Sequence, residues 1–208
     1  LYETISAPVL SNLDLATFTE SVVNPAAQII DSDVTLTSES NDFNGGNITI
    51  DYSIGGDIED QLTVANIGTG VGQIGFDGTN ITYEGNLIGN IDTINNGVNG
   101  SILEISLTTA NATVFAVEAL IEAISYQNTS DNPAASQAIS ITVNDGILDS
   151  NPQTAEITVT AENDAPVLDK TLDATGTNAD IELTVDEDTT PTGTVGNLVS
   201  EIVALTTG

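Results

Sequence analysis

The sequence predicts a mainly β chain, built as an antiparallel β-sandwich with one short helix, and three observations support this prediction. Apolar and polar residues alternate over several short stretches, as in strands with one buried and one exposed face. Asn-Gly and Asp-Gly pairs separate these stretches and suit tight turns. A single segment changes to helical spacing. The chain has 208 residues, enough to bury a core of ordinary size.

The expected strands are defined by apolar residues at every second position. These residues are Ile48 and Ile50; Leu62 and Val64; Ile81 and Tyr83; Leu103, Ile105 and Leu107; Ile139, Ile141 and Val143; and Ile157 and Val159. The turns between them are expected at residues 44–46, 77–78, 96–97, 99–100 and 144–146. Short strands with such turns indicate two packed sheets.

The expected helix lies near residues 113–125, in the stretch ATVFAVEALIEAISY. Thr113 is the expected N-cap. Four apolar residues fall at helical spacing, and two acids lie on the opposite side: Val117, Leu120, Ile121 and Ile124, against Glu118 and Glu122. We expect a helix of about three turns that caps one end or edge of the sandwich and serves packing.

An internal repeat defines the expected domains. The tetrapeptide Ala-Pro-Val-Leu occurs at residues 7–10 and again at 165–168, each time followed by an acid-bearing, strand-like piece, at 17–21 and 183–188. The prediction is therefore an N-terminal arm (1–6), a β-sandwich (7–164), and the start of a second repeat or an inter-subunit β segment (165–208). The last part is too short to close a sandwich, so its apolar faces and strand edges need cover.

Charge limits the classes of partner. Thirty-one acids stand against a single base, Lys170, for a formal net charge of -30. Nucleic acid and anionic membrane surfaces are repelled by such a chain, and cations are attracted. The alternative explanation is an acidic surface that serves only solvation. No stretch approaches the ~18 apolar residues of a membrane-spanning helix, so direct membrane insertion is not expected.

Residue types that are missing limit the chemistry. The chain has no Cys and no His, which removes disulfides, thiol nucleophiles, the commonest general base and the usual transition-metal ligands. Carboxylate, carbonyl and hydroxyl oxygens remain, and these suit hard ions such as calcium. A glycosidase would lack a sugar-stacking platform, since there is no Trp, four Phe and four Tyr. The sequence predicts a protein that is not an enzyme.

Several stretches together resemble one protein family. They are FNGGNITIDYSIGGDIEDQLTV, ITYEGNLIG, VEALIEAISYQNTSDNP, ISITVNDG and ITVTAENDAPVL. These stretches resemble the cadherin-like repeats of very large bacterial surface and calcium-dependent adhesion proteins, and the resemblance covers most of residues 7–168. It implies an Ig-like sandwich, an extracellular location at the cell surface, and calcium held at each junction by acids of one domain, the linker and the next domain.

The resemblance also implies a set of calcium ligands. The matching positions are Glu162, Asn163 and Asp164 in the linker, Asp57, Glu59 and Asp60 in a strand loop, Glu20 in an early strand, and the pair Asp31 and Asp33. The sequence departs from the family at two points. Thr-Ile-Ser, not Glu-Asn-Asp, precedes Ala7, and the Arg that normally lies within the strand-loop element is missing. The number of ions is not specified by these matches.

The residues themselves suggest how such a site would form. Calcium takes six to eight oxygens, more than any single loop of this chain supplies, so acids from separate segments must converge. The strand through Val159 leads into three oxygen-bearing residues at 162–164, and Pro166 then restricts the backbone. The alternative is a polar linker before a proline. At residues 144–146, Asn-Asp-Gly favours a hairpin turn over a ligand.

The expected function is that of a non-enzymatic extracellular repeat, stiffened by calcium and stacked head to tail as a spacer or fibre subunit. Strand donation between copies, by residues 1–10 or by the tail, is one variant. The alternative is an adhesin domain that binds carbohydrate or a surface protein. Expected partners are neighbouring copies, calcium, and glycans on Asn, Ser or Thr. Five Asn-x-Ser/Thr sequons begin at Asn47, Asn80, Asn99, Asn111 and Asn128.

Overall fold

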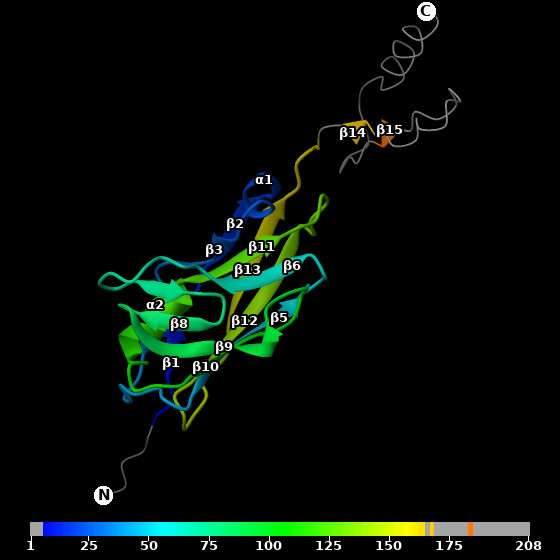
Figure 1. Cartoon of the computed structure of the whole chain (residues 1–208). Helices are drawn as coiled ribbons and strands as arrows, with labels where there is room; N and C mark the ends of the chain where they lie inside the picture. The colour runs from blue at the N-terminus through cyan, green and yellow to red at the C-terminus, as the bar shows by residue number, and fades with distance from the viewer. Residues whose placement is uncertain (1–5, 165–166, 169–182, 185–208) are drawn as a thin grey trace, which may run out of the picture. The chain divides into compact units, whose positions relative to one another are not determined.

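The computed structural model of the chain describes residues 6–164, 167–168 and 183–184 (Figure 1). Two compact units divide the chain, one formed by residues 1–160 and the other by 161–208. Strands dominate the described residues and helices are short, which confirms the prediction of a mainly β protein.

The largest sheet of the first unit has eight strands. In spatial order they are β2 (Ala16–Thr19), β13 (Gln153–Thr160), β12 (Ser136–Asn144), β5 (Asn47–Ile54), β10 (Leu103–Leu107), β9 (Asn86–Asn96), β8 (Asn80–Tyr83) and β7 (Ile74–Phe76). All neighbours in this sheet are antiparallel except β2 and β13, which run parallel. The predicted antiparallel sandwich therefore needs one correction: the early strand β2 forms the edge of this sheet and runs parallel to its neighbour β13.

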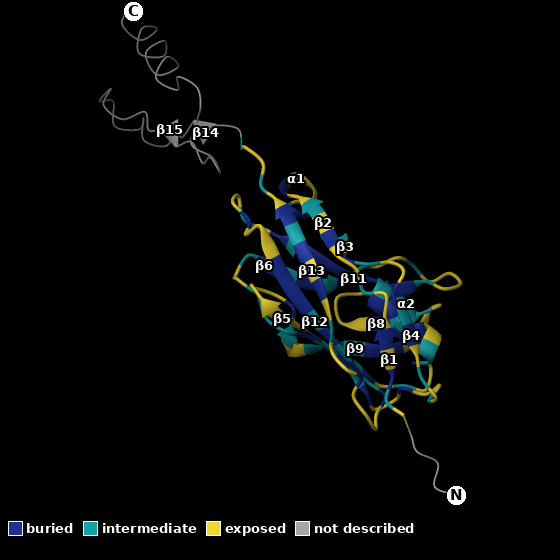
Figure 2. Cartoon of the chain, turned by 180° about the vertical axis from the view of Figure 1, so that it is seen from behind, coloured by how far each residue is buried: buried dark blue, intermediate teal, exposed yellow. Residues whose placement is uncertain are grey.

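Two smaller sheets complete the first unit. One has the order β3 (Gln28–Ile29), β11 (Ile124–Asn128) and β6 (Asp60–Val64), and the other pairs β1 (Val9–Ser11) with β4 (Thr35–Thr37). Phe18 of the eight-stranded sheet stacks on Tyr126 of the three-stranded sheet, with ring centroids 6.4 Å apart. The two sheets therefore pack face to face, as in a β-sandwich, and Figure 2 shows their buried residues.

The alternating apolar residues that predicted the strands lie in strands β5, β6, β8, β10, β12 and β13. All of them are buried except Tyr83, which packs partly buried against the core. Period-two spacing therefore located the inward faces of six strands correctly. The short strands β1, β3, β4 and β7 carry too few alternating residues to be found in this way.

Helix α2 (Val114–Glu122) confirms the predicted helix but is shorter than residues 113–125. The Thr113 hydroxyl caps it by accepting a hydrogen bond from Ala116 N at 3.3 Å. Ile124, which falls on the predicted apolar face of the helix, instead begins β11, where it pairs with Val64. The prediction failed there because a buried apolar residue fits a strand as well as a helix, and the sheet pairing decides between them.

A second helix, α1 (Glu20–Val23), is a single turn directly after β2 and was not predicted. In the second unit, β14 (Val167–Leu168) pairs antiparallel with β15 (Leu183–Thr184). Both copies of the Ala-Pro-Val-Leu repeat thus contain a strand, β1 in the first and β14 in the second. Most of the predicted arm (1–6) and of the predicted second repeat (165–208) lies outside the described residues. No helix among the described residues is long and apolar enough to cross a bilayer.

Candidate metal centre

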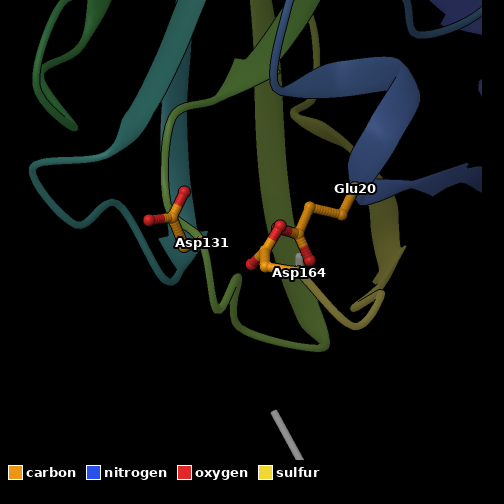
Figure 3. Close-up of side chains that lie close together, drawn as sticks. All are labelled: Glu20, Asp131 and Asp164. Carbon is orange, nitrogen blue, oxygen red and sulfur yellow. The ribbon is translucent and has the colours of Figure 1, made fainter. Parts of the chain in front are cut away.

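Three carboxylates meet at one end of strand β13. Glu20, Asp131 and Asp164 each place a carboxylate oxygen within 4.8 Å of the other two (Figure 3). No other group of three or more acids comes this close among the described residues. Glu20 is 5% exposed, Asp164 is half-buried and Asp131 is exposed. We call these three residues the carboxylate triad.

Strand pairing explains why two members of the triad meet. In the parallel pair, Thr19 of β2 lies opposite Thr160 of β13. Glu20 follows Thr19 directly as the first residue of α1, and Asp164 lies in the short segment that follows β13. Because the two strands are parallel, the segments that follow them leave the sheet at the same end, and the next residues of both segments come together there.

Asn24 connects the two segments that carry Glu20 and Asp131. Its side-chain amide donates to Ser130 O at 3.0 Å, next to Asp131, and its backbone N donates to Glu20 O at 2.8 Å. The side chain of Gln127 donates to Asn24 O at 2.8 Å. These bonds hold α1 against the loop between β11 and β12, so they set the spacing between Glu20 and Asp131.

The predicted ligand Asp60 is buried, with 1% of its surface exposed, in a network of hydrogen-bond donors. Its Oδ1 accepts from the Tyr126 hydroxyl at 2.5 Å and from Asn128 Nδ2 at 2.8 Å. Its Oδ2 accepts from the backbone N of Gly56 and Asp57, at 3.2 and 2.9 Å. Four donors thus stabilise a buried carboxylate, which ties the β5–β6 loop to β11. We call this arrangement the Asp60 network.

Burial raises the pKa of Tyr126, and the hydrogen bond to Asp60 raises it further. Burial likewise raises the pKa of Tyr52, with a smaller contribution from the nearby charge of Asp60. Both phenols therefore stay protonated at neutral pH, and Tyr126 remains a donor to the carboxylate.

The remaining predicted ligands lie in three places outside the triad. Asp57 is exposed, and Glu59 O accepts a hydrogen bond from Thr129 N at 3.0 Å, which brings the β5–β6 loop beside the end of β11. Glu162 and Asn163 are exposed in the segment before Asp164. The triad thus contains two of the nine predicted ligands, Glu20 and Asp164.

Asp31 and Asp33 lie near one another in the turn between β3 and β4. Asp31 Oδ2 accepts from Asp14 N at 2.7 Å, and Asp31 Oδ1 accepts from Asp33 N at 3.1 Å. A side-chain hydrogen bond with Asp31, together with its negative charge, raises the pKa of Asp33. The two carboxylates repel one another when both are ionised.

Asp145 is a further buried acid, 3% exposed, in the hairpin between β12 and β13. Its Oδ1 accepts from the backbone N of Ile147 and Leu148, at 2.9 and 2.8 Å. Its Oδ2 is buried and has no hydrogen-bond partner among the described residues. Asp145 is thus only half satisfied, in contrast to Asp60. These two bonds also form the turn that the Asn-Asp-Gly sequence predicts.

The donor set of the triad fits a hard divalent cation. All three groups are carboxylates, which are preferred ligands of calcium and magnesium. Residues 6–164 contain no Lys, Arg or His, so no side chain of the sandwich can neutralise these acids. Asp131 was missed in the sequence because it follows β11 in a loop, with no regular spacing from the other two acids. Its position after the predicted strand end, in Asn-Thr-Ser-Asp-Asn-Pro, was the available signal.

Neither a protein-family model nor a curated protein sequence matches the chain.

Proposed function

We propose that this chain is a non-enzymatic, extracellular structural repeat whose β-sandwich binds calcium at the carboxylate triad and stacks end to end with further copies. The observation that carries the proposal is the convergence of Glu20, Asp131 and Asp164 from three separate segments. Three acids at this spacing repel one another without a cation, and a bound divalent ion converts that repulsion into attraction.

A bound ion would fix the direction in which the chain leaves the sandwich. Asp164 lies in the segment after β13, whereas Glu20 and Asp131 belong to α1 and to the β11–β12 loop. Calcium shared by the three would hold the exit segment against the sandwich. Water and neighbouring carbonyl groups would complete the six to eight oxygens that calcium takes. Stiffness and length are then the function of the repeat.

The net charge of -30 supports the dependence on cations. Two copies of such a chain repel each other at low ionic strength, and divalent ions between them reduce this repulsion. The same charge, the absence of His and Cys, and the single base are consistent with a role that needs no catalysis.

Strand donation between copies is part of this proposal. The outer edge of β7 is covered, since Ile67 N and Gly68 N donate to Ile74 O at 2.8 and 2.9 Å. On the outer edge of β2 no backbone hydrogen bond is formed within the described residues. A strand from another copy would therefore be accepted at β2. Deleting residues 1–6 tests the arm as donor: fibres that still form by electron microscopy would exclude it.

The test of the calcium site is thermal unfolding and small-angle scattering of the chain with calcium and with chelator. We expect calcium to raise the melting temperature. At one hundred times its Kd, the ion adds about 2.7 kcal/mol to the free energy of unfolding. The maximum dimension should also become better defined. Asp131→Asn should lose this response, whereas Asp51→Asn, at an exposed acid of β5, removes the same charge and should keep it. An unchanged melting temperature and scattering curve in the wild type would remove calcium from the function.

A further inference from the structure

Five sequons offer an asparagine side chain for N-glycosylation, and the structure distinguishes between them. The reacting atom is the side-chain amide nitrogen, Nδ2, which must be exposed and free to enter the site of a transferase. The five asparagines can therefore be compared by what Nδ2 contacts.

Four of the five amide nitrogens are engaged in hydrogen bonds. Asn128 is 3% exposed and donates to Asp60 Oδ1 at 2.8 Å. Asn47 is half-buried in β5 and donates to Glu104 Oε1 at 3.3 Å. Asn80 and Asn111 are exposed, yet their amides donate to Asp77 Oδ2 and to Leu87 O, at 3.0 and 3.1 Å. Each of these bonds would have to break before the nitrogen could react.

Asn99 differs from all four. Its side chain is exposed and makes no hydrogen bond within the part of the chain that the structure describes. It occupies a tight turn in which Ser101 N donates to Val98 O at 3.2 Å. The two central residues, Asn99 and Gly100, have φ angles of 56° and 71°, as in a type I′ turn, so the side chain projects from a loop tip.

The turn that carries Asn99 lies beside the β5–β6 loop. Gln61 connects this turn to the β5–β6 loop, because its Oε1 accepts from Asn99 N at 3.0 Å and its Nε2 donates to Ile58 O at 3.0 Å. Ile58 is 68% exposed and Val98 is 46% exposed. The turn and the loop beside it are therefore open to solvent.

We propose that Asn99 is an N-glycosylation site of this chain. Nδ2 of Asn99 attacks the anomeric carbon of a sugar diphosphate donor, lipid-linked or nucleotide-linked, and a C–N bond forms. The bond from the anomeric carbon to the diphosphate oxygen breaks, the diphosphate leaves with the electron pair, and Nδ2 gives one proton to a base of the transferase.

The test presents the folded, full-length chain to a transferase that recognises Asn-x-Ser/Thr, in one arm with a nucleotide sugar and in the other with a lipid-linked sugar. Peptide mass mapping then locates the product. We expect the peptide containing Asn99 to gain a sugar before those containing Asn80 and Asn111. Success in one arm identifies the donor class. Absence of sugar on Asn99 in both arms, or earlier modification of another sequon, would overturn the proposal.

Two variants control this test. Asn99→Gln should lose the modification of the folded chain. Asn80→Gln, at a likewise exposed asparagine whose amide is hydrogen-bonded, should leave the Asn99 product unchanged. Circular dichroism and the melting temperature show whether each variant folds. A sugar that persists elsewhere at full level in Asn99→Gln would also contradict the proposal.

Discussion

The Asp60 network and the carboxylate triad differ in what surrounds the buried carboxylate. Both bury a carboxylate in a sandwich that contains no Lys, Arg or His. Asp60 is surrounded by four hydrogen-bond donors and needs no counter-ion. Glu20 instead has two further carboxylates within 4.8 Å. Since residues 6–164 contain no Lys, Arg or His, the donors around Asp60 define a structural acid, and we expect the converging acids of the triad to attract an external cation.

The largest expected effect comes from removing Asp60. Asp60→Ala leaves the buried Tyr126 hydroxyl and Asn128 amide without this acceptor, and it also removes the acceptor of two backbone N–H groups, those of Gly56 and Asp57. We expect a loss of about 3 kcal/mol or more of unfolding free energy, measured by chemical denaturation. The control is Asp51→Ala, at an exposed acid of β5, which should change stability by less than ~0.5 kcal/mol. Equal losses in both variants would show that the network contributes little.

The second prediction separates the two sites by their response to calcium. Asp60→Asn keeps the triad intact, so its melting temperature, although lower, should still rise with calcium. In chelator, the melting temperature of Asp131→Asn should be close to that of the wild type. With calcium at one hundred times Kd, this variant should lose most of the expected increase of about 2.7 kcal/mol in unfolding free energy. A calcium response that disappears in Asp60→Asn and persists in Asp131→Asn would reverse the assignment of the two sites.

A smaller effect is expected at Asn24, which connects α1 to the loop that carries Asp131. Asn24→Ala removes the hydrogen bond to Ser130 O and should cost about 1 kcal/mol of unfolding free energy in chelator. Calcium affinity, measured by titration calorimetry, should also fall because Glu20 and Asp131 are no longer held at a fixed spacing. Asn86→Ala, which removes one exposed bond in β9, is the control and should leave calcium affinity unchanged.

The smallest effect has the opposite sign. The pKa of Asp33 is raised by Asp31, so the folded state binds the proton more tightly than the unfolded state. Stability from this group is present at low pH and is lost as the pH rises through the raised pKa. Asp33→Asn should therefore increase the melting temperature at neutral pH, and the gain should vanish as the pH falls below the ordinary value of 3.8. A decrease at neutral pH would show that Asp33 has a favourable partner.

The sequence predicted the regular parts of the fold well and the site only in part. Alternation located β5, β6, β8, β10, β12 and β13, because a strand with one buried and one exposed face has apolar and polar residues in turn. It could not show that β2 pairs parallel with β13, since pairing across most of the chain leaves no local pattern. Ile124 was assigned to the helix for a similar reason: its partner, Val64, is distant in sequence.

The candidate site shows the same limit. Glu20 and Asp164 were predicted as ligands and lie together, whereas their neighbour Asp131 was not predicted. Asp60 was predicted from the same resemblance, and the structure gives both of its oxygens protein donors. Whether an acid faces donors or other acids depends on which loops meet, and residue spacing within one loop carries no information about that.

The parallel pairing of β2 and β13 has a mechanical consequence. When the first unit is pulled at its two ends, the force on β2 acts toward the N-terminal end of that strand and the force on β13 toward the C-terminal end of that strand. These forces are opposite because the strands are parallel. The load then acts along the strands, so the inter-strand bonds between residues 16–19 and 157–160 must rupture together rather than one after another. A module with this geometry resists tension far better than a hairpin that opens from one end.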